Sequence, residues 1–402
     1  MILTKQENEN EEQYLWRLGN AKDSGLIDLS WDDIADLMNK YCRSEEDEYR
    51  TASAYRKPYQ QAKRFFDSKV FTISEDEYIV QLTSARQELA KERVKIRDER
   101  TALNRELREQ GRRESMYEVV RNAFENYEGI KYDYVPSVVS HGDCDIIIHL
   151  TDIHCGIEID TAFNKFNESI LEDRLEKFLD EIYGIKELYK PENAYLILGG
   201  DFIHGIIHTN CRLESKENLV EQIMQCSDMV THFVYELSKM FNKVEVHTVV
   251  GNHSRSFQNK DESAHGENFD LLVPFVGKRA LSNIKNVEFK DNYLDCGIAN
   301  FVVRGHSVFA VHGDKDTAKT VVYNMTKIAR KANVALPDMC YLGHRHTNGL
   351  TTVDGVKVIE SGCVDGMDSY CIDERLTGTA EQTVTVVTES KMIKALCDIQ
   401  ID

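Results

Sequence analysis

The sequence Asp-Ile-Ile-Ile-His-Leu-Thr-Asp-Ile-His spans residues 145–154, and Ala-Tyr-Leu-Ile-Leu-Gly-Gly-Asp-Phe-Ile-His spans residues 194–204. Each stretch begins with an apolar run of strand length and ends in a turn that carries Asp and His side chains. Short apolar runs bounded by turn residues predict buried strands. Because open α/β sheets place functional side chains at the carboxyl ends of their strands, both stretches predict strands that lead into a site.

Working outward, the C-terminal two-thirds of the chain alternates apolar runs with helical stretches, which is typical of an α/β fold. Predicted strands cover residues 145–150, 194–198, 244–250, 301–304, 308–311, 339–342 and 356–359, with a further strand near 382–387. Predicted helices cover residues 167–188, 216–241, 267–281 and 317–332.

Composition limits the classes of protein that the chain can belong to. A length of 402 residues favours more than one domain. A net charge of −19 makes the chain a poor non-specific partner for polyanions unless positive charge is local. No apolar run approaches the roughly 20 residues of a membrane span, and the polar, acidic N-terminus is unlike a signal peptide, so we expect a cytoplasmic protein. The ten cysteines form no Cys-x-x-Cys pair and are expected to be reduced core residues.

The N-terminal region, residues 1–73, is predicted to be all-α. Ser30 and Asp33 mark a helix start, and a second helix is expected over residues 51–66. A short capped helix followed by a basic, aromatic helix resembles a helix-turn-helix, and a small helical bundle with a solvated basic face is the alternative. The candidate DNA contacts are Arg56, Lys57, Lys63 and Arg64.

Residues 74–135 are predicted to form a long charged helix that links this region to a catalytic domain at residues 136–402. An apolar column repeats every seven residues, and arginines fill the partner column. The apolar column is Leu82, Leu89, Ile96 and Leu103, and the arginines are Arg86, Arg93 and Arg100. A full two-column coiled coil is therefore not supported, and a helical spacer that associates into a homodimer is one interpretation.

Five predicted turns carry the residues suited to metal chemistry. They hold Asp152 and His154; Asp201 and His204; Asn252 and His253; His312; and His344 and His346. Side chains two apart on an extended segment point the same way, so a carboxylate and an imidazole can meet one cation. The glycines before Asp201 allow a tight turn that lets its two oxygens bridge two cations. Each turn alone could be a helix cap or a satisfied core histidine, but five together predict a metal site.

In order along the chain, these motifs resemble the calcineurin-like metallophosphoesterase superfamily over about residues 144–362. The motifs are Asp152-x-His154, Gly200-Asp201, Gly251-Asn252-His253, His312 and Gly343-His344-x-His346. The resemblance implies a β-sandwich flanked by helices. It also implies two metal ions, one held by Asp152, His154 and His346 and the other by Asn252, His312 and His344, with Asp201 as the bridge. His253 would protonate the leaving oxygen.

His204, three residues after Asp201, is similar to the pattern of the nuclease subunit of double-strand-break repair complexes, and the chain also resembles phage-encoded exonucleases. The resemblance implies a two-metal-dependent phosphodiester hydrolase that is a DNA exonuclease or endonuclease of the bacterial host cytoplasm. Ser254 stands where the family often has an acidic residue, which leaves the orientation of His253 open. Arg255 is a candidate phosphate contact, and His204 would position His253 or bind a phosphate oxygen.

Carboxylate, imidazole and amide ligands without thiolate suit Mn²⁺, Fe or Zn, with Mn²⁺ the leading candidate. Two other functions stay open: a phosphatase or cyclic-nucleotide phosphodiesterase, which the acidic charge favours, and a non-catalytic DNA-binding scaffold. Five further histidines match no motif position and are interpreted as structural or surface residues: His208, His232, His247, His265 and His306.

Overall fold

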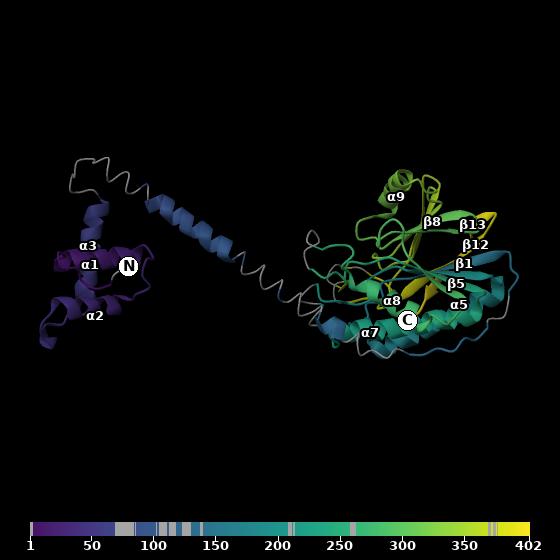
Figure 1. Cartoon of the computed structure of the whole chain (residues 1–402), viewed down its shortest axis with the longest axis horizontal. Helices are drawn as coiled ribbons and strands as arrows, with labels where there is room; N and C mark the ends of the chain where they lie inside the picture. Colours follow the sequence, from purple (N-terminus) through teal and green to yellow (C-terminus); the bar gives the residue numbers. More distant parts are fainter. Residues whose placement is uncertain are drawn as a thin grey trace. The chain divides into compact units, whose positions relative to one another are not determined.

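The computed structural model describes residues 3–68, 84, 86–101, 103, 111, 118–122, 130–136, 140–207, 211, 214–257, 263–368, 371–372, 375 and 377–402. The chain divides into two compact units, Met1–Arg108 and Glu109–Asp402 (Figure 1). Within the described part of the chain, no helix is both long and apolar enough to cross a membrane. All ten cysteines are free thiols.

In the described part of the first unit, α1 (Glu11–Asp23), α2 (Trp31–Cys42) and α3 (Ala52–Asp67) pack together as three helices, and residues 86–101 are also helical. The helix start at Ser30 is confirmed: its side chain accepts from the Asp33 N–H, and the Asp33 carboxylate accepts from the Ser30 N–H. Apolar and aromatic side chains from all three helices form one small core, which includes Tyr14, Leu18, Ile34, Met38, Tyr55 and Tyr59.

The connection between α2 and α3 spans residues 43–51 and contains a 3₁₀ turn, η1 (Glu46–Glu48). It is longer than the three- or four-residue turn typical of a helix-turn-helix, so the three helices match that motif only in part. Pro58 lies in the interior of α3, beyond its first turn.

The second unit contains two large sheets. The six-stranded sheet has the order β13-β12-β1-β4-β5-β6, and the five-stranded sheet has the order β10-β11-β9-β8-β7. The first comprises β1 (Cys144–Leu150), β4 (Asn193–Leu198), β5 (Lys243–Thr248), β6 (Val287–Lys290), β12 (Glu381–Thr388) and β13 (Lys391–Gln400). The second comprises β7 (Ala299–Val303), β8 (His306–Val311), β9 (Met339–Leu342), β10 (Gly349–Val353) and β11 (Val356–Glu360). A small hairpin joins β2 (Ile159–Asp160) to β3 (Lys165–Phe166).

The sheets and helices form layers, and three apolar cores lie between these layers. Ile146 and Ile148 of β1 lie in the core that the first sheet shares with its covering helices, whereas Ile147 lies in the core between the sheets. This alternation is the two-residue period of a strand. The helices on the first sheet are α5 (Glu168–Tyr189), α7 (Leu219–Met240) and α8 (Leu272–Ala280), and α9 (Ala318–Ala332) covers the second sheet. The predicted sandwich flanked by helices is confirmed (Figure 1).

The predicted strands and helices are present, with boundaries shifted by a few residues. The helix expected over residues 267–281 instead begins as a 3₁₀ turn, η3 (Phe269–Leu271), before α8. Three edge or near-edge strands, β6, β10 and β13, were not predicted, because few of their residues are fully buried and they lack a long apolar run. Of the predicted long helix, residues 86–101 are helical, and Leu82 lies outside the described residues.

Candidate metal centre

The predicted ligand turns meet at one edge of the sandwich. Strands β1, β4 and β5 are parallel neighbours, as are β8 and β9, so their carboxyl ends lie together. The turns after β1 and β4 also pair with each other: the Asp152 N–H donates to Gly200 O at 3.0 Å, and the His154 N–H donates to Asp201 O at 3.1 Å. These backbone bonds fix the spacing of the first two ligand turns.

Asp152, His154 and His346 form the first ligand group. The two histidine Nε2 atoms are 3.4 Å apart, and Asp152 Oδ1 lies 3.3 Å from His346 Nε2 and 3.8 Å from His154 Nε2. Asp152 Oδ1 is buried and accepts no hydrogen bond from any described residue. Donors that share one cation at about 2.0–2.2 Å lie roughly 3–4 Å from one another, so this group fits a metal ion.

Asp201, His312 and His344 form the second group. The His312 Nδ1–H donates to Gly199 O at 2.9 Å, and its Nε2 lies 3.0 Å from Asp201 Oδ2. Two acceptor atoms this close need a proton or a cation between them. Burial lowers the pKa of His312, but the charges of Asp201 and Asp152 outweigh burial and raise this pKa to about 10. Asn252 Oδ1 is buried and has no hydrogen-bond donor among the described residues, as expected of an amide that completes a metal site.

The two groups are in direct contact, because the His344 N–H donates to Asp152 Oδ2 at 2.9 Å. Both donor sets consist of carboxylate, imidazole and amide atoms, which suit divalent cations that accept mixed oxygen and nitrogen ligands. The groups His154–His204–His253 and His346–Cys363–Asp365 also have ligand atoms within 4.8 Å of one another. The thiol-containing group lies beside the first ligand group and was not predicted.

The backbone at the ligand positions is in the left-handed region. The φ angles are 52° at Asp152, 49° at His154, 52° at Asp201, 67° at His344 and 54° at His346. Such a conformation costs a non-glycine residue roughly 1–3 kcal/mol and clusters at functional sites. The fold therefore holds these side chains in positions that local backbone preference opposes.

Two glycines allow the backbone to lie close to the candidate ligands Asp201 and Asp152. A Cβ on Gly251 would lie 2.1 Å from Asp201 Oδ1, and a Cβ on Gly343 would lie 2.5 Å from Asp152 Oδ2. Neither position can carry a side chain without displacing a candidate ligand. Gly251 and Gly343 of the motifs are thus explained by contact with the carboxylates.

His253 lies beside both ligand groups. Its N–H donates to Asp201 Oδ1 at 2.7 Å, and its ring Nδ1 lies 3.0 Å from His204 O, which makes Nδ1 the hydrogen-bond donor. The His253 ring centroid is 4.6 Å from that of His154 and 5.6 Å from that of His204. His204 is buried, with Nε2 3.8 Å from a Glu214 carboxylate oxygen. These contacts orient His253 without the acidic neighbour that the family often has.

Asp270 is a buried carboxylate beside Ser254, the residue that stands at the family's acidic position. Its carboxylate accepts the N–H groups of Asp201, Phe202 and Gly251 at 2.9, 3.1 and 2.8 Å, and it also accepts the Ser254 hydroxyl. It therefore ties the turn after β4 to the turn after β5. Burial, followed by the charge of Asp201, raises the pKa of Asp270 to about 6. No motif marks Asp270 in the sequence, and only the fold brings it under both turns.

Opposing effects act on the pKa values of the two acidic ligands. Burial alone would raise the pKa of Asp152 and of Asp201. Hydrogen bonds and charge from neighbouring histidines outweigh burial and hold both pKa values below the usual range. Burial, followed by the charge of His312, lowers the pKa of His344 to about 4. Ionised carboxylates and a neutral imidazole are the forms that bind a cation.

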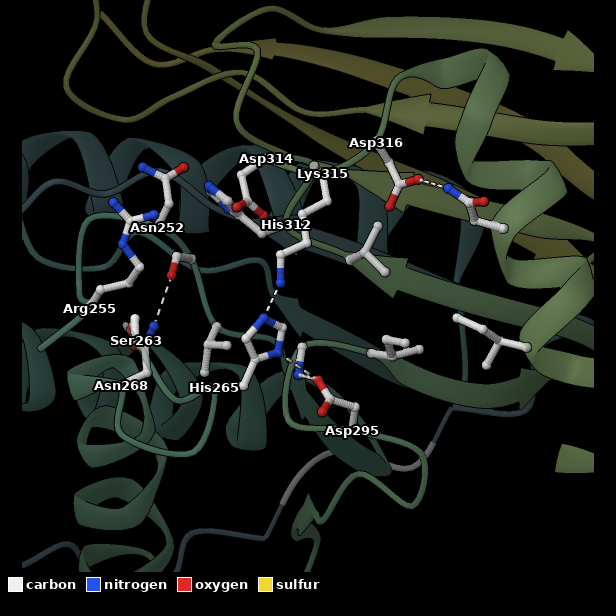
Figure 2. A pocket seen from close by; sticks show the side chains of 18 of the residues that line it. Asn252, Arg255, Ser263, His265, Asn268, Asp295, His312, Asp314, Lys315 and Asp316 are labelled. Atoms are coloured by element: carbon white, nitrogen blue, oxygen red, sulfur yellow. Dashed lines mark hydrogen bonds and ion pairs between the residues drawn. The ribbon is translucent and has the colours of Figure 1, made fainter. Parts of the chain in front are cut away.

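A pocket of about 340 Å³ opens beside the second ligand group, and Asn252 and His312 belong to its lining (Figure 2). Arg255, the candidate phosphate contact, lines the same pocket. His265, which is exposed as expected of a surface residue, also lines this pocket. Its sequence neighbours carry no motif that could have revealed this.

The remaining candidates lie elsewhere. Arg56, Lys57 and Arg64 are exposed on α3, whereas Lys63 is paired with Asp23. Of the other histidines, His247 stacks on Phe301 and His232 is exposed, as expected of structural and surface residues. His306 Nε2 contacts Thr388 O at 3.0 Å, and His208 lies outside the described residues.

Three family models match the chain. Residues 203–388, within the second unit, match the calcineurin-like phosphoesterase superfamily domain. Residues 1–73 match the YonJ N-terminal domain, and residues 85–127 match the YonJ coiled-coil domain. The coiled-coil match lies on the region for which a long charged helix is predicted. The phosphoesterase match begins after Asp201. It therefore does not include Asp152, His154 or Asp201, and the structural support for these three candidate ligands is their geometry.

Among curated proteins, the chain is similar to the SPbeta prophage-derived uncharacterized protein YonJ of Bacillus subtilis strain 168, with 22% identity over 381 residues and 90% of each chain covered. Among solved structures it is similar to an archaeal phosphodiesterase, with 14% identity, a TM-score of 0.31, and 63% of this chain and 99% of that chain covered. It is also similar to the zinc complex of Vps29 from Entamoeba histolytica, with 11% identity, a TM-score of 0.28, and coverage of 64% and 99%.

Proposed function

We propose that this protein is a two-metal-dependent phosphodiester hydrolase that cleaves DNA as an exonuclease or endonuclease. The observation that carries the proposal is the pair of adjoining ligand groups with His253 beside them. Asp152, His154 and His346 would hold one ion, and Asn252, His312 and His344 the other. Asp201 would lie between the two, and Mn²⁺ is the first ion to test, with Fe and Zn as alternatives.

When bound, two such cations would make a water more acidic and neutralise charge on the phosphate. His253 has a defined task in this scheme. Its Nδ1–H is engaged by the His204 carbonyl, which leaves Nε2 to carry the proton that the leaving oxygen needs. Buried His204 stands beside it to hold a phosphate oxygen, and Arg255 in the adjoining pocket supplies positive charge for the substrate.

DNA is proposed over a small phosphate ester for two reasons. His204 three residues after Asp201 is similar to the nuclease pattern, and cationic side chains lie in the pocket next to the ligands. A net charge of −19 is the observation that favours a phosphatase or cyclic-nucleotide phosphodiesterase instead. The proposal places the enzyme in the bacterial cytoplasm. It also includes a homodimer formed through the charged helix, where Leu89, Ile96 and Leu103 are more than half exposed.

The test is Mn²⁺-dependent cleavage of end-labelled single- and double-stranded DNA by the full chain, together with hydrolysis of bis-p-nitrophenyl phosphate. Asp201→Asn is the inactive control, and Asp160→Asn, an exposed carboxylate on β2, is the matched control that should retain activity. Cleavage lost only in Asp201→Asn is the expected result. Hydrolysis of the small diester without DNA cleavage would replace the nuclease by a small-molecule phosphodiesterase. Absence of any hydrolysis would favour a DNA-binding scaffold.

A further inference from the structure

The pocket beside the ligand groups has room for part of a substrate. Its cavity of about 340 Å³ falls within the range of roughly 300–1,000 Å³ for small-ligand sites. Asn252 and His312 belong both to the ligand set and to the pocket wall. A group attached to a phosphate at the ligands could therefore extend into this pocket.

Three cationic side chains line the pocket: Arg255, Lys315 and Lys327. Figure 2 shows Asn252 and Arg255 on one wall, with Lys315 reaching toward His265 across the cavity. His265 in turn contacts Asp295 through Nδ1 at 3.1 Å, so a hydrogen-bonded line runs from Lys315 to Asp295.

The carboxylates of the same wall are engaged by neighbours. Asp295 also accepts the Gly297 N–H at 2.8 Å, and Asp316 accepts the Asn324 side-chain amide at 2.7 Å. Asp314 lies within the electrostatic reach of Arg255. The negative charge of the wall is therefore partly satisfied within the protein, and an anionic group would meet the cations of the pocket.

Helix α9 adds further cationic side chains beside the pocket. Lys319, Tyr323, Lys327 and Arg330 are spaced by four, four and three residues, so they share one face of the helix, and all are exposed. The Tyr323 ring is 66% exposed, and the Lys327 Nζ lies 4.8 Å from its centroid. Lys327 belongs both to this face and to the pocket. We call these four residues the α9 face.

Helix stability does not explain the α9 face. The helix packs on the second sheet through Val321, Val322, Met325 and Ala329, which lie on its other side. Arg330 near the C-terminus is favoured by the helix dipole, but Lys319 in the first turn is disfavoured by it. The helix contains no acidic residue, although the chain has a net charge of −19. The local charge is what an acidic protein needs to bind a polyanion.

We propose that the pocket and the α9 face form one track for a single strand of DNA. The pocket takes the nucleoside next to the phosphate at the ligands. Lys319, Lys327 and Arg330 contact phosphates further along, and a base stacks on Tyr323. An exposed aromatic ring among cations is the usual arrangement for single strands, because unpaired bases offer their faces. This inference builds on the proposed phosphodiesterase function and specifies its substrate.

Binding tests the track without catalysis. In EDTA, 5′-fluorescein-labelled (dT)₁₂ is titrated with the full chain, with Lys319→Glu/Arg330→Glu, and with Lys278→Glu/Arg279→Glu. The last pair makes the same charge change on exposed residues of α8 that do not line this pocket. We expect the α9 variant to bind at least tenfold more weakly and to have a log–log salt slope smaller by about 1.4, or 0.7 per lost phosphate contact. Tyr323→Ala should weaken binding by at least about fivefold. Equal losses in the α8 control would overturn the track.

Hydrolysis then separates the track from the active centre. Bis-p-nitrophenyl phosphate is too short to reach α9, so the α9 variant should hydrolyse it at the wild-type rate while its kcat/KM for the oligonucleotide falls at least tenfold. Unchanged binding and cleavage of (dT)₁₂ by this variant would overturn the track and leave the phosphodiesterase intact. If the wild type hydrolysed no diester, the proposed function would fail, and the EDTA titration would still decide whether the α9 face binds DNA.

Discussion

His253 is held through its backbone by Asp201 and through its ring by the His204 carbonyl, so its proton can be offered at one defined place. His253→Asn should slow DNA cleavage by about 10²–10⁴-fold, because an alkoxide leaves poorly without a proton. Hydrolysis of bis-p-nitrophenyl phosphate should fall much less, since p-nitrophenolate leaves without one. Equal losses on both substrates, measured as kcat, would contradict the assignment.

Asp270 is expected to be a positioning residue. Asp270→Ala leaves three backbone N–H groups and the Ser254 hydroxyl without their acceptor. Each buried donor left unpaired costs about 1–3 kcal/mol, so the free energy of unfolding should fall by at least about 3 kcal/mol. Urea unfolding measures this loss, and Mn²⁺ titration calorimetry should show affinity lower by about 10–100-fold. Asp270→Asn keeps one acceptor oxygen and should be less affected on both measurements.

His149 gives a prediction for pH. It is fully buried on β1, and burial lowers its pKa from 6.5 to about 3. Between those values the unfolded chain binds a proton that the folded chain does not, so stability falls as pH falls below 6.5. From pH 6.5 to pH 5 the loss is about 2 kcal/mol. His149→Leu should flatten the pH dependence of urea unfolding in this window, whereas His232→Gln, an exposed control, should leave it unchanged.

Among individual residues, the sequence predicts those site residues that directly follow an apolar strand and belong to a recognisable motif. The ligands Asp152, Asp201 and His312 belong to this class, and the fold brings them together as expected. Asp270 and His265 could not be predicted, since each reaches the site from a loop or short helix without a neighbouring motif. Their place depends on packing between segments that are distant in sequence.

Among the elements, the strand-end turns carry the metal prediction. Because the metal binds the folded turns and not the unfolded chain, Mn²⁺ at 100 times its Kd should stabilise the protein by about 2.7 kcal/mol. Addition of EDTA should remove the increase in Tm. Asp201→Asn should show little increase, and Asp160→Asn should respond as the wild type does. An unchanged response in Asp201→Asn would place the metal elsewhere.

The same scale shows which elements sequence patterns can predict. Central strands such as β1 and β9 are fully buried and appear as continuous apolar runs, so their positions were predicted closely. Outer strands such as β10 and β13 are largely half-buried or exposed and mix polar with apolar residues, so they resemble loops. The helix over residues 86–101 has one apolar column, a pattern that does not separate a helical spacer from a coiled coil.

For the whole molecule, we expect the first compact unit to retain DNA and the second to hydrolyse it. Deleting residues 1–71 should weaken retention of double-stranded DNA, because Arg56, Lys57 and Arg64 of α3 are removed. Hydrolysis of bis-p-nitrophenyl phosphate should persist, since all candidate ligands lie in the other unit. Gel-shift titration and the diester assay measure the two properties separately, and a truncated chain that retains duplex DNA as strongly as the full chain would refute this division.

Five candidate ligands have a left-handed backbone. The side chains that would bind metal therefore lower the stability of the metal-free protein. Glycine adopts this conformation without strain, so Asp152→Gly or His344→Gly should relax the metal-free protein while removing a ligand. A population of variants selected only for heat resistance in the presence of chelator would be expected to accumulate glycine at these positions. Continued selection for metal-dependent activity is then what would keep an aspartate or histidine there.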